Sequence, residues 1–158
     1  MLTILGIDTG YALTGYGIVT MNDRDISVVD FGVIKTESSS FPTDRFNDIY
    51  EGITELIDKY SPDVMAIEQI FFFKNQKTFV NVLQARGVIL ISAIHKNIQI
   101  AEYTPLQVKQ ALTGYGRADK SQIQTMVKAR LNLSEIPKPD DAADALAICL
   151  THIQTSEF

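Results

Sequence analysis

Three strand-like segments precede the first helix-like segment of this 158-residue chain. Residues 2–8 (LTILGID) are mostly aliphatic, as in a buried strand. Two further strand-like runs follow at about 14–21 and 26–36, joined by the turn-rich NDRD. Because so short a connection joins antiparallel neighbours, the start of the chain predicts an antiparallel three-stranded meander.

Helix-like and strand-like segments then alternate. In chain order they are predicted as a helix over 43–60, a strand over 64–69, a helix over 77–95, a strand over 98–104, and helices over 105–113, 116–133 and 140–153. Because a helix precedes it, the fourth strand is expected to run parallel to the first. The chain therefore predicts a single α/β domain over 1–158, with a five-stranded mixed sheet, its first three strands antiparallel, flanked by helices on both faces.

Acidic residues stand where these elements end. Asp8 ends the first strand, Glu68 ends the fourth, and Asp141 and Asp144 are three residues apart on the last helix and so share one face. Since the carboxyl ends of parallel neighbours meet at one edge of a sheet, we expect Asp8 and Glu68 side by side. The last helix would turn Asp141, Asp144 or both toward the same point.

Each acid also has a structural interpretation. Asp140 and Asp141 would serve equally as helix caps that complement the helix dipole, and Asp8 as a turn residue before Thr9. Glu68 is harder to explain in this way, because an acid that follows the buried run VMAI is costly without a partner.

Several carboxylates close together need protons or a cation. All-oxygen ligands favour Mg²⁺ or Mn²⁺, and two histidines without a CxxC motif do not predict a zinc site. Two such ions about 3.5 to 4 Å apart split phosphodiesters by activating a water and stabilising the leaving 3′ oxygen, so no protein nucleophile is needed. The sequence thus predicts a two-metal site at Asp8, Glu68, Asp141 and Asp144.

The charge distribution is uneven. Residues 1–70 carry four bases and twelve acids, residues 71–138 carry ten bases and three acids, and residues 139–158 carry no base and four acids. A middle segment of net charge +7 is typical of a basic face for an anionic partner, or of a solvated charged surface.

Five motifs together resemble the RuvC family of bacterial Holliday junction resolvases, in the RNase H-like superfamily. They are ILGIDTGYALTGYGIV, AIEQIFFFKN, QARGV, QVKQALTGYGRADKSQI and DDAADALAICLTH, in this order across nearly the whole chain. The resemblance implies catalytic acids at Asp8, Glu68, Asp141 and Asp144, with Asp140 as a helix cap. It implies a homodimer that cuts four-way junctions symmetrically with Mg²⁺ or Mn²⁺, leaving 5′-phosphate and 3′-hydroxyl ends, alongside the branch-migration proteins RuvA and RuvB.

The resemblance also assigns roles within the basic segment. It places Lys109 and Lys120 near the scissile phosphate, where cations offset charge in the transition state. Phe71 corresponds to an aromatic that stacks on an unpaired base, although packing in the core would explain a phenylalanine equally well. Four further residues are expected to contact backbone phosphates or to be solvated surface: Lys74, Lys77, Arg86 and Arg117.

Three other functions deserve comparison. A phosphotransferase of the actin and sugar-kinase type needs two related halves, which 158 residues without a repeat do not supply. A silent junction-binding protein has no use for four clustered acids. A related RNase H-like nuclease that acts on RNA is the alternative that the sequence does not exclude. Apolar runs that break before 18 residues and an N-terminus without a basic flank predict neither a spanning helix nor a signal peptide, and hence a cytoplasmic protein without membrane contact.

Overall fold

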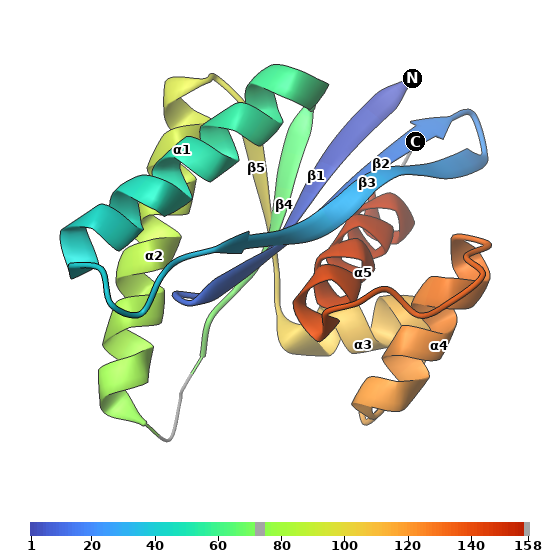
Figure 1. The fold of residues 1–158 in the computed structure, drawn as a ribbon. Helices are drawn as coiled ribbons and strands as arrows, with labels where there is room; N and C mark the ends of the chain where they lie inside the picture. The colour runs from blue at the N-terminus through green and yellow to red at the C-terminus, as the bar shows by residue number, and fades with distance from the viewer. Residues whose placement is uncertain (72–74, 157–158) are drawn as a thin grey trace.

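A computed structural model describes residues 1–71 and 75–156. They form a five-stranded sheet with the order β3-β2-β1-β4-β5 (Figure 1). The strands are β1 (Leu2–Asp8), β2 (Leu13–Asn22), β3 (Asp25–Lys35), β4 (Val64–Glu68) and β5 (Gln99–Tyr103). β1, β2 and β3 pair antiparallel, whereas β4 runs parallel to both β1 and β5. The predicted mixed sheet is confirmed, including the parallel pairing of the first and fourth strands.

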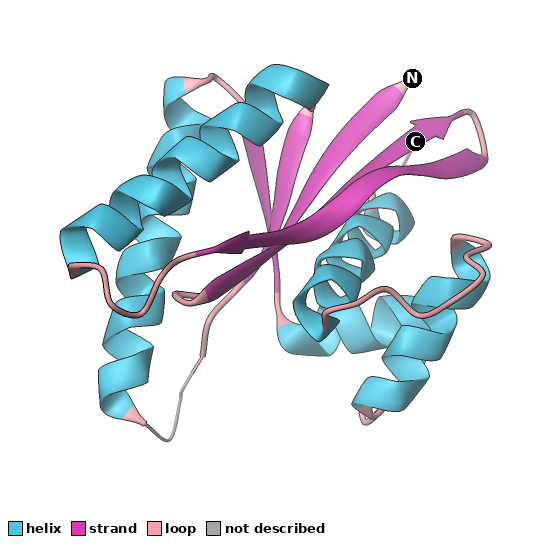
Figure 2. Cartoon of the chain, viewed as in Figure 1, coloured by secondary structure: helices cyan, strands magenta, loops and turns pink. Residues whose placement is uncertain are grey.

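Five helices cover the two faces of this sheet (Figures 1 and 2). They are α1 (Pro42–Tyr60), α2 (Gln76–His95), α3 (Pro105–Thr113), α4 (Lys120–Arg130) and α5 (Asp140–Thr155). α1 and α2 lie on one face, and α3, α4 and α5 lie on the other (Figure 1). The helix predicted over 116–133 is shorter than expected at both ends. It begins only at Lys120 because the Asp119 side chain caps it, accepting a hydrogen bond from the backbone N–H of Gln122.

Two apolar clusters fill the space between sheet and helices. On the α1 face, Ile49, Ile53 and Ile57 stand four residues apart and are buried against the sheet, as the helical period predicts. On the other face, α5 is buried along most of its length from Ala142 to Thr151. α5 is therefore the central helix of its layer, and its polar first turn lies where the packed core meets the surface.

The connection from β5 to α3 is short and firmly capped. Thr104 accepts a hydrogen bond from the backbone N–H of Gln107, whose side chain accepts one in return from the N–H of Thr104, and Pro105 occupies the first turn. α3 ends at Gly114, which has a φ of 71°. Because of this cap, α3 begins directly after the carboxyl end of β5, at the edge of the sheet where β1 and β4 also end.

Helix α2 is strongly apolar. Among the described residues it is the one helix that meets the length and composition of a membrane span, although the sequence pattern predicted none. That criterion is weak, since core helices of globular proteins also meet it. α2 packs against α1, buries Val82, Ala85 and Ile89, and holds an ion pair through Arg86 in its middle.

Candidate active site

The ends of β1 and β4 bring two acids to the same level of the sheet. The parallel register pairs Ile4 with Val64 and continues to Ile7 with Ile67, so that Asp8 and Glu68 follow at adjacent strand ends. The predicted juxtaposition of these two residues at the carboxyl edge is confirmed.

Helix α5 adds a third acid because glycines in the sheet let it approach closely. A Cβ at Gly6 would lie 2.3 Å from the carbonyl oxygen of Ala145, and one at Gly15 would lie 2.0 Å from that of Asp141. The backbone of α5 therefore rests directly on β1 and β2, with small side chains such as Ala142 and Ala145 fully buried. The sequence analysis did not identify the glycines of the sheet that permit this approach.

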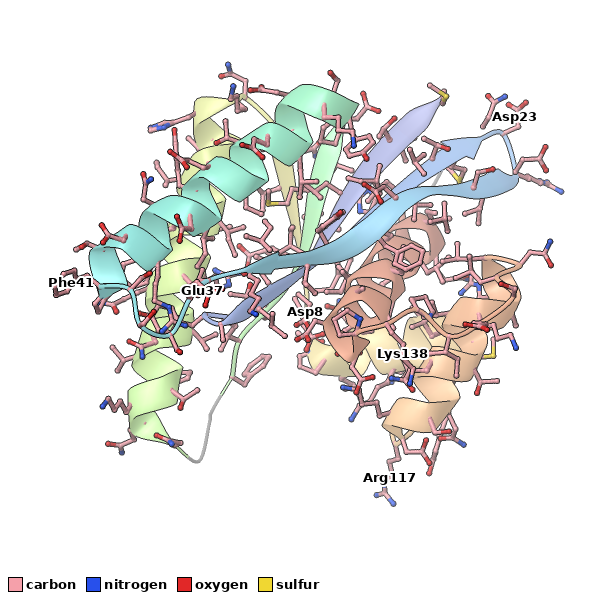
Figure 3. All side chains as sticks on the ribbon, viewed as in Figure 1. Asp8, Asp23, Glu37, Phe41, Arg117 and Lys138 are labelled. Carbon is pink, nitrogen blue, oxygen red and sulfur yellow. The ribbon has the colours of Figure 1, made fainter. Side chains whose placement is uncertain are left out.

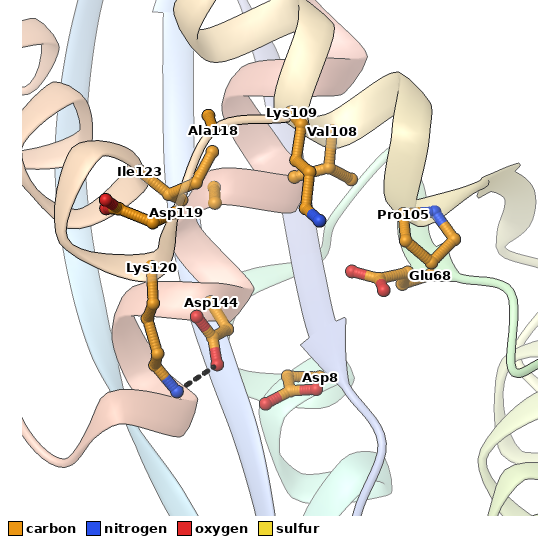
Figure 4. Close-up of a pocket in the computed structure, with 11 residues that line it drawn as sticks. Asp8, Glu68, Pro105, Val108, Lys109, Ala118, Asp119, Lys120, Ile123 and Asp144 are labelled. Atoms are coloured by element: carbon orange, nitrogen blue, oxygen red, sulfur yellow. Dashed lines mark hydrogen bonds and ion pairs between the residues drawn. The ribbon is translucent and has the colours of Figure 1, made fainter. Parts of the chain in front are cut away.

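The three acids line a pocket of about 360 Å³. Asp8, Glu68 and Asp144 line it together with Lys109 of α3 and Lys120 of α4 (Figure 4). Its remaining lining comes from residues that sequence reasoning missed: Pro105, Val108, Ala118, Asp119, Ile123 and Ala147. The start of α3 at Pro105 was predicted correctly, and the capping signal at Asp119 would have located the start of α4, which supplies Lys120.

Lys120 is held between two carboxylates of α5. Its Nζ lies 3.4 Å from Asp144 Oδ2 and 3.3 Å from Asp140 Oδ2. The capping role expected for Asp140 is wrong: the helix is preceded by Pro139 without a side-chain cap, and Asp140 instead contacts Lys120 and accepts a hydrogen bond of 3.2 Å from Gln124. It still places negative charge in the first turn, which complements the helix dipole.

The pocket strongly disfavours the charged forms of its acids. Burial, followed by the charges of Asp144, Asp141 and Glu68, raises the pKa of Asp8 to about 8. Burial and the charge of Asp144 raise the pKa of Glu68 to about 7, with Lys109 opposing the shift. Burial also raises the pKa of Asp144, against the opposing effect of Lys120. At neutral pH the cluster therefore needs a proton or an added cation.

The fourth predicted acid, Asp141, is set apart from the pocket. It is half-buried and does not line the cavity, yet its charge contributes to the raised pKa of Asp8. Within residues 1–71 and 75–156, no three Asp, Glu, His or Cys side chains already stand as a ligand set for a metal. The donors still suit Mg²⁺ or Mn²⁺, because they are all carboxylate oxygens whose mutual repulsion a divalent cation would relieve.

A neutral side chain at position 8 is expected to stabilise the metal-free protein at alkaline pH. A carboxyl group whose pKa is about 8 in the folded chain and near 4 when unfolded makes the folded state bind more protons between these values. Its contribution to stability is complete below pH 4 and is lost as the pH rises through 8. We therefore expect Asp8→Asn to raise the free energy of unfolding by roughly 2 to 4 kcal/mol at pH 8.5 and very little at pH 4.

Urea unfolding in EDTA at both pH values measures this difference. Asp48→Asn, which removes an exposed acid of α1, is the matched control and should change neither value by more than about 0.5 kcal/mol. Equal stability of wild type and Asp8→Asn at pH 8.5 would contradict the raised pKa of Asp8 in the folded protein.

The other predicted residues lie at different distances from the pocket. Phe71 is 57% exposed and lines a hollow of about 240 Å³ that also contacts Asp8 and Glu68. Lys77 and Arg117 are exposed, and Arg117 projects from the start of the α4 region into solvent (Figure 3). Lys74 lies outside the described residues. Arg86 is instead ion-paired with Glu102 at 2.9 Å.

This sheet order, with acids at the ends of β1 and β4 and on the helix packed across them, defines an RNase H-like protein with a site of the kind used in metal-dependent phosphodiester cleavage. Residues 4–152 match the family described as crossover junction endodeoxyribonuclease RuvC. The chain belongs to the RuvC family, as the sequence motifs predicted.

Relatives and solved structures agree with this assignment. The RuvC protein of Caldicellulosiruptor saccharolyticus is 54% identical over 156 residues, covering 98% of this chain and 94% of its own length. That of Fusobacterium nucleatum is 52% identical, covering 98% of this chain and 81% of its own. Thermus thermophilus RuvC in complex with Holliday junction substrate superposes with a TM-score of 0.91 at 33% identity, covering 97% of this chain and 93% of its own. A yeast mitochondrial Holliday junction resolvase, at 14% identity and a TM-score of 0.73, shares the fold.

Proposed function

We propose that this protein is a structure-selective endonuclease that resolves four-way DNA junctions by paired, symmetric nicks. The observation that carries the proposal is the match to the RuvC family over residues 4–152 in a chain whose pocket brings three acids and two lysines together. Relatives about 50% identical over almost the whole chain are named crossover junction endodeoxyribonucleases. Cleavage would leave 5′-phosphate and 3′-hydroxyl ends.

Four acids are proposed to hold the divalent ions. Asp8, Glu68 and Asp144 supply carboxylate oxygens from the pocket wall, and Asp141, whose charge already acts on Asp8, joins them from the first turn of α5. Two Mg²⁺ or Mn²⁺ ions, when bound, activate a water and stabilise the leaving 3′ oxygen. The protein's part is to keep the acids on rigid strand ends and a packed helix, so that little reorganisation is needed during the reaction.

The two lysines are proposed to bind the scissile phosphate from opposite sides of the acids. Lys109 lies near Glu68, whereas Lys120 is paired with Asp144 (Figure 4). Asp144 would be among the residues that hold a divalent ion, and Lys120 would donate hydrogen bonds to a phosphate oxygen instead of to Asp144. Both lysines then offset negative charge that develops in the transition state.

Further DNA contacts are proposed around this centre. Phe71 is exposed beside the pocket, where its ring is available to stack on an unpaired base. Lys77 and Arg117 present exposed cationic side chains that suit backbone phosphates, and Lys74 is proposed for the same role from its place in the basic segment. Arg86 fits this role less well, because its side chain is only 17% exposed and is paired with Glu102.

A homodimer is proposed through one face of α2. Exposed apolar side chains recur along it at Val80, Leu83, Ile91 and Ile94, with exposed fractions between 41% and 55%. Gly87 lies between them, and a Cβ there would have no neighbour within 4 Å. Such a stripe around a glycine suits close crossing of two symmetry-related helices, so we define these five residues as the dimer face. A pair of active sites would then cut two strands of like polarity in a four-way junction.

A charge in the dimer face is expected to dissociate the dimer. Ile91→Glu would place two glutamates in a symmetric interface, one from each subunit. We therefore expect the dissociation constant of the dimer to rise at least about 30-fold. Analytical ultracentrifugation measures the change. Val29→Glu alters a similarly exposed apolar residue on β3 and should leave the dimer intact. Dissociation by both variants, or by neither, would contradict the assignment of the interface to α2.

The remaining parts of the proposal concern cellular context. By family resemblance, the protein would act on junctions handled by the branch-migration proteins RuvA and RuvB, in the cytoplasm. Co-sedimentation of the purified chain with RuvA bound to a junction tests the first point directly.

Cleavage of a synthetic four-way junction tests the proposed activity. Linear duplex and an RNA–DNA hybrid serve as control substrates, each in Mg²⁺ and in EDTA. We expect symmetric nicks in the junction alone and only with metal. Equal cutting of duplex, preferential cutting of the hybrid, cutting in EDTA, or binding without any cutting would each contradict the proposal.

A further inference from the structure

The loop between β1 and β2 begins directly after Asp8. On one side Asp8 pairs with Gly15 of β2, but the pairing of β1 with β4 ends one residue earlier, at Ile7. Thr9 does not anchor the loop, because its buried hydroxyl has no hydrogen-bond partner among the described residues. The position of Asp8 therefore depends in part on what holds residues 10–12.

Three successive carbonyl groups of this loop accept hydrogen bonds. The carbonyl of Gly10 accepts from the hydroxyl of Thr14 at 2.8 Å, within the hairpin itself. The next two accept from Thr36, which follows β3: its hydroxyl donates to Tyr11 at 2.7 Å and its backbone N–H donates to Ala12 at 3.0 Å. Thr36 is only 4% exposed, so both of its bonds are shielded from water. Thr36 thus joins the loop to the end of β3.

A buried arginine fixes the direction of the Thr36 hydroxyl. Arg45, near the start of α1, donates from Nε to Thr36 Oγ1 at 2.9 Å. Because this oxygen accepts from Arg45, its single proton is left to donate to the carbonyl of Tyr11. The guanidinium carbon of Arg45 also lies 3.8 Å from the centre of the Tyr11 ring, as a cation–π contact. One side chain therefore holds both the anchor of the loop and the aromatic residue within it.

Neither ion pairing nor direct contact with the pocket explains this arginine. Arg45 is 9% exposed, and among the described residues no carboxylate lies within ion-pair distance of it. It does not line the catalytic pocket either. Burying a cation without a carboxylate partner is costly, so the contacts of Arg45 with Thr36 and Tyr11 point to a role in ordering the loop.

We infer that Arg45 is a positioning residue for the proposed cleavage: through Thr36 and Tyr11 it fixes the β1–β2 loop and so holds Asp8 in place to bind a divalent ion. The inference rests on the proposed function, to which it adds a residue that touches neither metal nor DNA. Without Arg45, the Thr36 hydroxyl is free to turn away from Tyr11, and the loop loosens beside Asp8. A less ordered carboxylate binds an ion more weakly and supports slower cleavage, while DNA binding is unchanged.

Two substitutions interrupt this connection, and two more are controls. Thr36→Val removes the hydroxyl but keeps the shape of the side chain, which leaves Arg45 Nε and the Tyr11 carbonyl without their partner. Arg45→Met removes the donor and the charge but keeps an unbranched side chain. Thr36→Ser restores the hydroxyl and should behave as wild type. Ile57→Val weakens the packing of α1 at its other end, so it controls for a general loss of stability.

Hydrogen exchange of the backbone amide of residue 36 measures opening of the loop directly, in EDTA and without DNA. This N–H donates to the carbonyl of Ala12, so it exchanges when the loop separates from the end of β3. We expect about tenfold faster exchange in Thr36→Val and Arg45→Met, a factor that loss of one buried hydrogen bond accounts for. Exchange in Thr36→Ser and Ile57→Val should stay within about threefold of wild type.

Ion binding and cleavage measure the consequence at Asp8. Mn²⁺ is titrated calorimetrically without DNA, and single-turnover cleavage of a junction is followed at rising Mg²⁺. In Thr36→Val and Arg45→Met we expect the Mn²⁺ dissociation constant and the Mg²⁺ concentration for half-maximal rate to rise about tenfold, as for other residues that orient metal ligands. The dissociation constant of the junction in EDTA should stay within about twofold of wild type.

Three results would overturn the inference. They are unaltered exchange at residue 36 in Thr36→Val, equal acceleration of that exchange in Ile57→Val, and faster exchange with unchanged Mn²⁺ affinity, which would leave Arg45 a structural role alone. Thr36→Val is close to isosteric and carries the test even if Arg45→Met does not fold. Exchange and Mn²⁺ binding are measured without DNA, so they report on Arg45 even if no junction is cut. Failure of the proposed cleavage and failure of this inference are therefore distinguishable.

Discussion

Asp144→Asn is expected to lower the rate of junction cleavage at least about 10³-fold while leaving junction binding intact or slightly stronger. Asp144 is the acid of α5 that lines the pocket, and its carboxylate raises the pKa of both Asp8 and Glu68. An amide there removes a proposed anionic ligand for a divalent ion, and about 4 kcal/mol of lost transition-state stabilisation corresponds to this factor. Binding should survive because one negative charge near the phosphates is removed.

Asp140→Asn is the matched control for this experiment. Both substitutions remove one of the two ion pairs of Lys120, but Asp140 does not line the pocket. We expect it to retain cleavage within about tenfold of wild type, since exposed ion pairs contribute little. Single-turnover cleavage and junction binding are measured for both variants, together with thermal unfolding. A comparable loss of cleavage in both variants, or loss of folding in Asp144→Asn, would instead assign Asp144 a structural role.

Gly15→Ala is expected to cost about 3 kcal/mol of unfolding free energy and about 10²-fold in cleavage rate. The new Cβ would lie 2.0 Å from the carbonyl oxygen and 2.9 Å from the Cβ of Asp141. A backbone carbonyl within a helix has little freedom to move aside, so α5 must shift from the sheet as a whole. A displacement near 1 Å at the proposed catalytic acids would account for the loss of rate.

The comparison for Gly15 is Gly32→Ala on β3. There the three atoms nearest to the new Cβ belong to the side chain of Tyr16, at 3.0 to 3.1 Å, and a side chain is able to adjust. We expect less than half the loss of stability and cleavage within about threefold of wild type. Urea unfolding and the single-turnover rate are the measurements. Similar losses for the two variants would mean that close approach of α5 is not what the glycine at position 15 permits.

Much of the fold was predictable because it depends on local patterns. The four-residue spacing of Ile49, Ile53 and Ile57 defines the buried face of α1, and strand β1 is an unbroken apolar run that ends on an acid. The predictions were wrong where a side-chain hydrogen bond determines the residue at which a helix begins. The start of α4 was placed too early because Asp119 caps the helix, and Asp140 was given a capping role that the structure assigns to neither acid of the first turn.

The candidate site was likewise predictable only in part. Asp8 and Glu68 were predictable as neighbours, because parallel pairing of two strands with a known end brings their last residues together. Which acid of α5 faces them was left open, since Asp141 and Asp144 share one helical face. The structure places Asp144 in the pocket and Asp141 beside it. It also pairs Arg86, which was expected to contact phosphates or to be solvated surface, with Glu102.

The sequence by itself determined the order of the elements, the mixed sheet and the acids at its carboxyl edge, because apolar period and strand pairing are written in neighbouring residues. Only the tertiary structure decided how near α5 lies to the sheet, which acid enters the pocket, and where Arg86 and Glu102 meet. The reason is that these depend on contacts between segments far apart in the chain. Gly6 and Gly15 become meaningful only against the backbone of α5, about 130 residues later in the chain.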